Sequence, residues 1–384
     1  MAETRTHYRL TPYDTWFFRE SRPMNSLGGV ELSSVFPPPT RTVLGALRTA
    51  IGDATGIAWK QFNAAHALTE WIGFGDDLGP LALERLWVCR DGNRLYPAPA
   101  SLLCDAAKTT YTRLAVGNAL DTHLGRVRLP CIPHDKPGLK PMQNAWLTQA
   151  GMQAMLASKV PDAGEVVRID DLLKRESRLG IALDATHTVE AGALYQTQHL
   201  RLKPGVSLEL ALRHASGMPA PASLARLGGE GRLASIEPIP ARPCALAVSN
   251  MPQAGNGLVL YLLSDADCQK HNGAPNGLPP DFEPRKAADG SVHWHGRINQ
   301  VALTIECAVL GKSVREGGWD MARREPRAAH SLIPAGSCYY ARVADDALSV
   351  ADAIRNLHGR CMDDNKLGRG LLACGVWPAT ENLL

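Results

Sequence analysis

A series of four elements in the middle of this 384-residue chain recurs at its end, and this repetition limits the folds open to the sequence. The first copy begins with "VSLELALRH" (206–214), in which apolar Val206, Leu208, Leu210 and Leu212 alternate with other residues. Such alternation predicts a half-buried strand with these four side chains on one face. The rest of the copy is a short helical piece, a glycine loop and a closing strand: "PASLARLG" (221–228), "GGEGR" (228–232) and "LASIEPIP" (233–240).

The second copy repeats this order as strand, amphipathic helix, glycine loop and strand: "SCYYARV" (337–343), "LSVADAIRNLHG" (348–359), "NKLGRG" (365–370) and "LLACGVW" (371–377). Earlier strand patterns precede each copy: "THYRLTPYD" (6–14), "GLVLYLLSD" (257–265) and "VALTIECAV" (301–309). Two tandem βαββαβ units of the ferredoxin-like type account for this order. We therefore expect an α+β fold.

The expected domains follow from this repeat. A segment rich in proline and glycine near residue 243 predicts the boundary, with an N-terminal domain over 1–242 and a C-terminal domain over 243–384. The stretch 53–180 is too long for one connection, so we expect it to be an insertion in the first domain.

The first domain opens with a helix entered through three prolines, "FPPPTRTVLGALRTAIG" (36–52). Thr40 is a good N-cap candidate, and the apolar residues behind it have helical spacing. Arg41 and Arg48 are seven residues apart, so they share a face away from the apolar stripe. A helix start with a nearby guanidinium favours phosphate. Alternatively, both arginines simply face water on an ordinary core helix.

The amino-acid composition excludes few classes of protein. The chain has 45% hydrophobic and 21% charged residues and a net charge of only +3, and 30 of its 41 basic residues are arginine. The nine cysteines form no CxxC pair, so a zinc finger is not expected. Because no leader and no run of 18 apolar residues accompanies them, we expect a cytoplasmic protein that does not bind a membrane.

No catalytic constellation stands out. Both glycine loops follow a helix and open a strand, the reverse of a dinucleotide-binding fingerprint. "HWH" (293–295) puts two histidines on one strand face, either as half of a metal site or as an ordinary polar pair.

Read together, several blocks resemble the RAMP proteins of CRISPR systems, and among them the third subunit of the type III-B (Cmr) effector. The blocks are "LTPYDTWFFRESRP" (10–23), "FPPPTRTVLGALRTAIG" (36–52), "SRLGIALDATHTVEAGALYQTQHLRL" (177–202), "LGGEGR" (227–232), "GGWD" (317–320) and "IPAGSCYY" (333–340). The stretch 53–176 has no quotable match, so no family role is carried into it.

The resemblance implies an RNA-binding subunit with no catalytic residue, cofactor or metal ion. Its partners would be the 5′ handle of the guide RNA, the large multidomain subunit and an adjacent backbone RAMP subunit. Residues 178–200 would form a thumb-like hairpin, although a plain surface hairpin is the alternative. The implied RNA contacts are Arg19, Arg22, Thr40, Arg41, Arg48, Arg178, His187, Gly228, Gly229, Gly231, Arg232, Trp319, Gly368, Arg369 and Gly370.

Other interpretations of these residues stay open at the level of sequence. The glycines either cradle phosphate with backbone N–H groups or only form a tight turn. Trp319 either stacks on a base or anchors a core. Arg19 and Arg22 either contact phosphate or face solvent.

Two other functions remain open. Some RAMP proteins cut the guide precursor, which requires a general base such as His7, His66, His187 or His199. A small-molecule enzyme on a duplicated ferredoxin-like fold is the third possibility.

Overall fold

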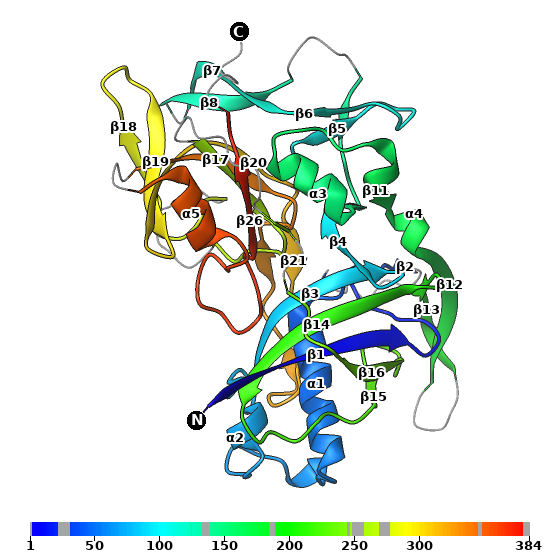
Figure 1. Cartoon of the computed structure of the whole chain (residues 1–384). Helices are drawn as coiled ribbons and strands as arrows, with labels where there is room; N and C mark the ends of the chain where they lie inside the picture. The colour runs from blue at the N-terminus through cyan, green and yellow to red at the C-terminus, as the bar shows by residue number, and fades with distance from the viewer. Residues whose placement is uncertain are drawn as a thin grey trace.

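The computed structural model describes residues 2–21, 31–123, 125–132, 138–183, 189–243, 246–247, 257–268, 277–344 and 348–378, with the side chains of 182, 183 and 189–194 left aside. The fold is mixed α+β, with many strands and few helices, as expected (Figure 1). The helices are α1 (Thr40–Ala54), α2 (Thr69–Ile72), α3 (Gln149–Leu156), α4 (Ile169–Leu172) and α5 (Val350–Leu357).

The larger sheet has eight strands and contains both strands that flank the first glycine loop. In sheet order they are β11 (Val166–Arg168), β10 (Ala145–Leu147), β4 (Asn93–Pro97), β3 (Ala82–Arg90), β14 (Val206–Ala215), β1 (Glu3–Pro12), β16 (Leu233–Ile239) and β15 (Leu224–Arg226). The central pairs β3–β14, β14–β1 and β1–β16 are antiparallel. Helix α1 covers one face, where Val43, Leu44 and Leu47 join Leu208 and Leu210 in one core.

The second sheet has six strands and is formed by the C-terminal part of the chain. Its order is β18 (Glu283–Lys286), β19 (Val292–Ile298), β20 (Val301–Val309), β25 (Cys338–Val343), β17 (Gly257–Leu262) and β26 (Leu372–Val376). Helix α5 buries Ala353, Ile354 and Leu357 against this sheet. Its N-cap is Ser349, whose side chain accepts a hydrogen bond from the Asp352 amide.

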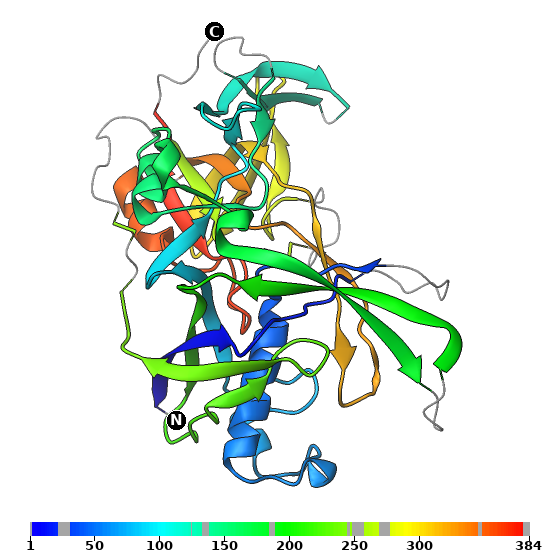
Figure 2. The same cartoon turned by 90° about the vertical axis from the view of Figure 1, so that its right-hand side faces the viewer.

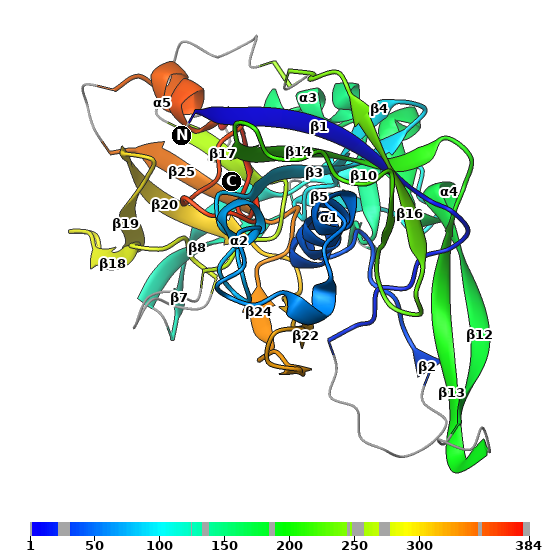
Figure 3. The ribbon, with the colours of Figure 1, turned by 90° about the horizontal axis from the view of Figure 1, so that it is seen from below.

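A long hairpin carries a third sheet, made of β12 (Leu173–Leu183), β13 (Val189–Leu202) and β2 (Glu31–Leu32). Strands β12 and β13 pair in register from Leu173↔Leu202 to Ile181↔Leu194. Figures 2 and 3 show the hairpin projecting well away from the two main sheets. The expected thumb region, residues 178–200, lies in this hairpin.

Smaller hairpins complete the chain. They are β5 (Leu102–Cys104) with β6 (Tyr111–Arg113) and β9 (Lys140–Pro141), β7 (Ala115–Thr122) with β8 (Gly125–Cys131), β21 (Val314–Glu316) with β24 (His330–Leu332), and β22 (Trp319–Asp320) with β23 (Glu325–Pro326). The last two pairs form one excursion from the second sheet, here called the 314–332 arm.

The stretch 53–180 contributes strands to the larger sheet and packs against the second. It supplies β3, β4, β10 and β11 to the larger sheet. Helix α3 packs Met152 and Met155 into a core shared with Tyr261 and Tyr340 of the second sheet. The Tyr340 hydroxyl also donates to the Leu114 carbonyl at 2.9 Å. This stretch therefore ties the two sheets together.

Two local expectations were wrong. Residues 221–228 do not form a helix: Leu224–Arg226 is strand β15, with Ala225 opposite Ala234 of β16. Pro221 and the pairing edge of β16 outweigh the apolar spacing of this short segment. Strand β14 is buried on both faces rather than half-buried, and even Glu209 is only 2% exposed.

The remaining predicted strands and the C-terminal helix are confirmed within a few residues. No helix in the described part of the chain is long and apolar enough to cross a membrane. Cys89, Cys104, Cys307, Cys338 and Cys374 are buried.

Candidate nucleic-acid interface

Residues 14–21, here called the connector, leave the end of β1 and touch three distant parts of the chain. Trp16 exchanges two backbone hydrogen bonds with Leu200 of the hairpin, at 3.0 and 2.7 Å. The Phe17 carbonyl accepts from the Gly229 amide at 2.8 Å. The Ser21 hydroxyl accepts from the Gly317 amide of the 314–332 arm at 2.8 Å. The connector therefore brings the hairpin, the first glycine loop and this arm together.

The first glycine loop (residues 228–232) lies directly on the connector. Gly228 has a φ of +89°, and an added Cβ there would lie 2.5 Å from the Phe17 carbonyl oxygen. Only glycine fits both this angle and this approach. The next residues, Glu230 and Gly231, also have positive φ, at 57° and 61°. Glycine is therefore required at position 228 by the backbone angle and by packing on the connector, whether or not the loop binds a ligand.

The amides of this loop are largely unused. Within the described residues, Gly229 donates to Phe17 and Arg232 donates to the Gly229 carbonyl, whereas the amides of Gly228, Glu230 and Gly231 have no acceptor. Backbone N–H groups displayed by a turn of this kind form an anion-binding concavity. The loop is therefore able to hold phosphate without rearranging its own hydrogen bonds.

Three arginines surround Asp14 beside this loop. Arg178 and Arg201, both from the base of the hairpin, donate to Asp14 at 3.1 and 2.9 Å, and Arg232 lies 3.6 Å from it. Glu176 also pairs with Arg178 and Arg201. The Arg178 hydrogen bond helps to keep the pKa of Asp14 below its ordinary value. These five side chains are here called the thumb-base cluster. It is net positive, because it has three arginines and two carboxylates.

Within the described part of the chain, the candidate histidines make no contact with one another. His199 is 1% exposed, its Nδ1 lies 3.1 Å from the Thr15 hydroxyl, and its ring stacks on Phe17. Burial and the nearby arginines lower the pKa of His199 to about 4. His66 Nδ1 accepts from the Leu68 amide, and His7 lies on β1. His187 lies outside the described residues.

The opening helix has the predicted faces but not the predicted cap. Val43, Leu44, Leu47 and Ile51 are fully buried. Thr40 is the first residue of α1, and the N-cap is Pro39, whose carbonyl accepts from the amides at 42 and 43. Thr40 makes no side-chain cap because the extended geometry of the cap position falls on the last proline instead.

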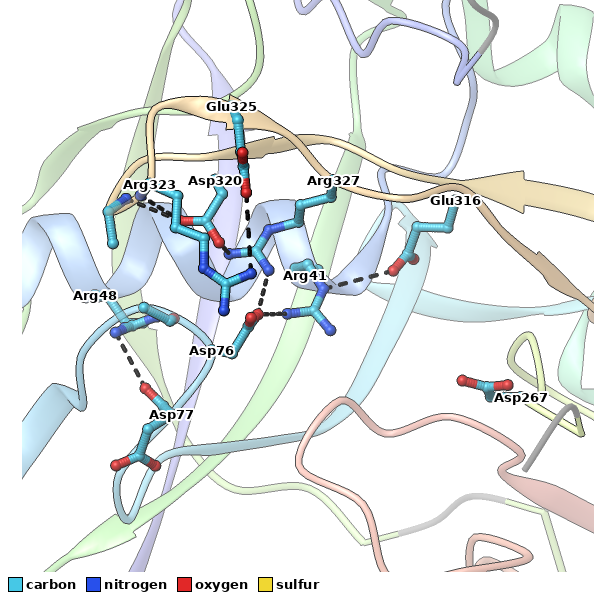
Figure 4. Close-up of polar contacts among 12 residues, drawn as sticks. Arg41, Arg48, Asp76, Asp77, Asp267, Glu316, Asp320, Arg323, Glu325 and Arg327 are labelled. Atoms are coloured by element: carbon cyan, nitrogen blue, oxygen red, sulfur yellow. Dashed lines mark hydrogen bonds and ion pairs between the residues drawn. The ribbon is translucent and has the colours of Figure 1, made fainter. Parts of the chain in front are cut away.

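Arg41 and Arg48 share one face, as predicted, and both contact the loop at 73–79 (Figure 4). Arg41 lies 3.6 Å from Asp76 and 3.8 Å from Glu316, and its side chain is 33% exposed. Arg48 donates to the carbonyls of Gly75 and Asp77 at 3.1 and 3.3 Å. Burial is the main reason that the pKa of each guanidinium is lowered.

The 314–332 arm completes this second charged cluster, the helix-mouth cluster. Arg327 pairs with Asp76 and, at 2.9 Å, with Asp320, which is 3% exposed. Figure 4 shows Arg41, Arg327 and Asp76 pointing toward one another from α1, the arm and the loop. The arginines predicted to meet phosphate are thus already neutralised in part by carboxylates of the same chain.

The second glycine loop joins the two main sheets. Gly368 has a φ of +60°, and an added Cβ would lie 2.6 Å from the Glu84 carbonyl oxygen of β3. The amide of Arg369 donates to Asn365, and that of Gly370 donates to the Asp265 carbonyl. The Arg369 side chain pairs with Glu316 and, at 3.3 Å, with Asp267. This loop therefore uses the amides of Arg369 and Gly370 for hydrogen bonds within the chain, whereas most amides of the first loop have no acceptor in the described residues.

The remaining predicted contacts lie nearby or outside the described part. Trp319 is 56% exposed on the arm, so the alternative that it anchors a buried core is wrong. Arg19 forms an isolated bridge with Ser34 in the connector region. Arg22 lies outside the described residues.

The sequence interpretation missed the carboxylates of both clusters. Asp14, Glu176 and Asp76 were not proposed as partners of the arginines in these clusters. No local signal marks Asp14 or Asp76, because their partners Arg178 and Arg327 are 164 and 251 residues away in the chain.

The described residues contain no group of three or more His, Cys, Asp or Glu side chains placed to hold a metal ion. The two histidines at 293 and 295 instead contact hydroxyl groups: His293 Nε2 lies 2.9 Å from Ser291, and His295 Nδ1 lies 3.1 Å from Thr304.

Comparison with known proteins gives one decisive match. No curated protein sequence matches the chain. Among solved structures, two cryo-EM structures of the Type III-B Cmr-beta complex contain a similar chain at 14% identity, one bound to cognate target RNA and the other to cognate target RNA and AMPPnP. Each comparison covers 87% of this chain and 86% of the other, with TM-scores of 0.47 and 0.46, respectively. A family model described as CRISPR-associated protein (Cas_Cmr3) matches residues 8–377, and the chain belongs to this family.

Proposed function

We propose that this chain is a non-catalytic, RNA-binding subunit of a type III-B CRISPR effector. In this role it holds the 5′ handle of the guide RNA and docks on the large multidomain subunit, next to a backbone RAMP subunit. Membership of the Cas_Cmr3 family supports the assignment to a CRISPR effector. A cytoplasmic location stays a prediction.

The observation that carries the RNA-binding proposal is the geometry around the first glycine loop. The unused amides of Gly228, Glu230 and Gly231 stand beside the net positive thumb-base cluster. Amides and guanidinium groups together suit a phosphate backbone, whereas sequence readout needs contacts with base edges. Tyr13 and Leu179 adjoin Asp14 and Arg178 in the sequence, and their exposed fractions are 80% and 72%. Such exposed apolar side chains are suited to contact with unstacked bases.

The fold proposal is two ferredoxin-like units, with the boundary near residue 243. In the first, the sheet order β16-β1-β14-β3 with α1 between β1 and β3 supports it. In the second, the order β26-β17-β25-β20 with α5 between β25 and β26 supports it. Each unit then has one of the two usual helices.

The test is a two-residue insertion into "GGEGR", made between Glu230 and Gly231. The insertion moves the Gly231 amide away from those of Gly228 and Glu230 but leaves the Gly228 contact with the connector in place. We expect a folded protein that no longer assembles with guide RNA and the other subunits. Purification of the complex from the native host, followed by sequencing of the RNA bound to it, measures this. Assembly at the level of the unchanged chain would refute the role of the loop.

We further propose that this subunit breaks no RNA bond itself. A general base must reach the 2′-hydroxyl within hydrogen-bond distance. His199 is enclosed at 1% exposure and has a pKa of about 4, so it is poorly placed and weakly basic. Incubation of repeat RNA with the purified chain should give no single-site cleavage, and cleavage lost in His199→Ala would favour the endoribonuclease alternative.

A further inference from the structure

A pocket of about 370 Å³ lies where β3 and β4 meet the start of α3 and the segment that follows β16. Its wall includes Arg90, Arg94, Gln149 and Arg242. This pocket lies on the opposite face of the larger sheet from α1. Strand β14 shows this, because Leu208 and Leu210 pack against α1 and the intervening Glu209 contacts Arg94 and Arg242 instead. The pocket is therefore distinct from the connector and its two charged clusters.

The charge at this pocket is not balanced by the chain. Glu209 is 2% exposed and accepts hydrogen bonds from both Arg94 and Arg242, so one buried carboxylate serves two guanidinium groups. The Arg94 side chain is 4% exposed and lies over the Trp87 ring, 3.9 Å from its centroid. Arg94 is buried, whereas the Arg242 side chain is 42% exposed, so these two guanidinium groups and Glu209 leave one net positive charge at the pocket wall. An anion at the pocket would complete the balance.

The half-buried Arg90 adds a further cation. Within the described residues it has no hydrogen-bond or ion-pair partner. Asp91 also lines the pocket, and its carboxylate lies beside the turn at Gly205, 2.1 Å from where a Cβ on that glycine would stand. Three arginines, Arg90, Arg94 and Arg242, against the carboxylates of Asp91 and Glu209 still leave the pocket with one net positive charge. The pocket wall also includes Ala150, in the first turn of α3, whose amide has no acceptor in the described part.

From these observations we propose that the pocket binds a phosphate monoester carried by a nucleotide. Guanidinium groups bind phosphate oxygens through paired, charge-assisted hydrogen bonds, and the volume lies within the range of small-ligand pockets. The rest of the wall suits a nucleoside, because it combines polar and apolar residues: Asn93 and Gln149, which have amide side chains, with Leu95 and Pro243. Either a free nucleoside monophosphate or the phosphorylated end of an RNA supplies this group.

The test is calorimetric titration of the full chain with AMP, with adenosine, and with a tetranucleotide that does or does not carry a terminal phosphate. Arg90→Glu is the variant, because the Arg90 side chain has no partner whose loss would unfold the protein. Arg285→Glu, on strand β18 of the other sheet, changes the charge equally and is the matched control. Arg178→Ala with Arg232→Ala removes two of the three thumb-base arginines and separates this pocket from the proposed RNA site.

We expect AMP to bind and adenosine not to bind, because the phosphate supplies the attraction. Arg90→Glu should weaken AMP binding about tenfold or more, which corresponds to about 1.4 kcal/mol, whereas Arg285→Glu and the thumb-base variant should change it less than about twofold. Preference for AMP or for the phosphorylated tetranucleotide identifies the source of the phosphate. The proposal fails if no phosphorylated probe binds, if adenosine binds equally well, or if Arg285→Glu weakens binding as much as Arg90→Glu.

Discussion

The Arg178 guanidinium, at the base of the long hairpin, donates to the Asp14 carboxylate at the start of the connector, 3.1 Å away. The two residues are 164 positions apart in the chain. Their contact fixes the hairpin next to the first glycine loop, where Arg232 approaches the same carboxylate. Asp14 thereby orients the cations that we propose meet RNA and also offsets part of their charge.

This dual role gives a prediction for Asp14→Asn. The change removes one negative charge beside Arg178, Arg201 and Arg232, so we expect guide RNA to bind several-fold more tightly at low salt. Stability should fall by no more than about 1 kcal/mol, because these side chains are partly exposed. Filter binding and chemical denaturation measure the two effects. Weaker RNA binding by a folded variant would mean that orientation matters more than charge.

Two glycines of the first loop should respond differently to alanine. At Gly228 a Cβ meets the Phe17 carbonyl oxygen at 2.5 Å, while at Gly231 it meets no atom within 4 Å. Both have positive φ, which costs alanine about 1–2 kcal/mol. We expect Gly228→Ala to lower the free energy of unfolding by more than about 2 kcal/mol and Gly231→Ala by about 1 kcal/mol. Equal losses in denaturant titrations would contradict the close packing of the loop on the connector.

Arg41 and Arg48 should differ in their contribution to RNA binding. The partners of Arg41 lie at 3.6 and 3.8 Å, so a phosphate can replace them, whereas Arg48 donates directly to two carbonyls. We expect Arg41→Ala to reduce the salt dependence of RNA binding by about one phosphate contact. Arg48→Ala should leave it unchanged and lower the thermal midpoint. The reverse pattern, read from binding at several salt concentrations, would show that the helix mouth opens on binding.

Stability should fall in mild acid because of His199. Its folded pKa of about 4 lies below the unfolded value near 6.5, so the unfolded chain binds more protons between these values. Stability is therefore full above about pH 6.5 and is lost as the pH falls toward 4, by roughly 3 kcal/mol for this one group. Denaturant titrations of the unchanged chain and of His199→Gln across this range measure it. The same pH dependence in both proteins would exclude His199 as the cause.

The repeat pattern predicted much of the larger architecture because strands and the C-terminal helix depend on local periodicity. The alternation in β14 and the spacing in α1 correctly placed Leu208, Leu210, Val43 and Leu44 in a core. The same alternation gave the wrong environment for Glu209, because the second face is covered by Arg94 and by Arg242. Contacts between residues this far apart in the chain cannot be predicted from local periodicity.

The candidate site was predicted only in part for the same reason. Arg178, Arg232 and the first glycine loop were identified from the family resemblance, and the structure brings them together. Their shared carboxylate, Asp14, lies in the block 10–23 that carried the resemblance, but no pattern there links it to an arginine 164 residues away. At the helix mouth, Asp76 and Asp320 come from a loop and an arm that only the tertiary fold places beside α1.

The most direct test of the account is the salt dependence of guide RNA binding by the chain with and without Arg178 and Arg232, two of the three thumb-base arginines. Each phosphate contact with a single strand contributes about 0.7 to the slope of log K against log salt concentration. The account predicts that Arg178→Ala with Arg232→Ala weakens binding and reduces this slope by about 1.4, while Arg285→Ala changes neither. An unchanged slope and affinity in the folded double variant would contradict it.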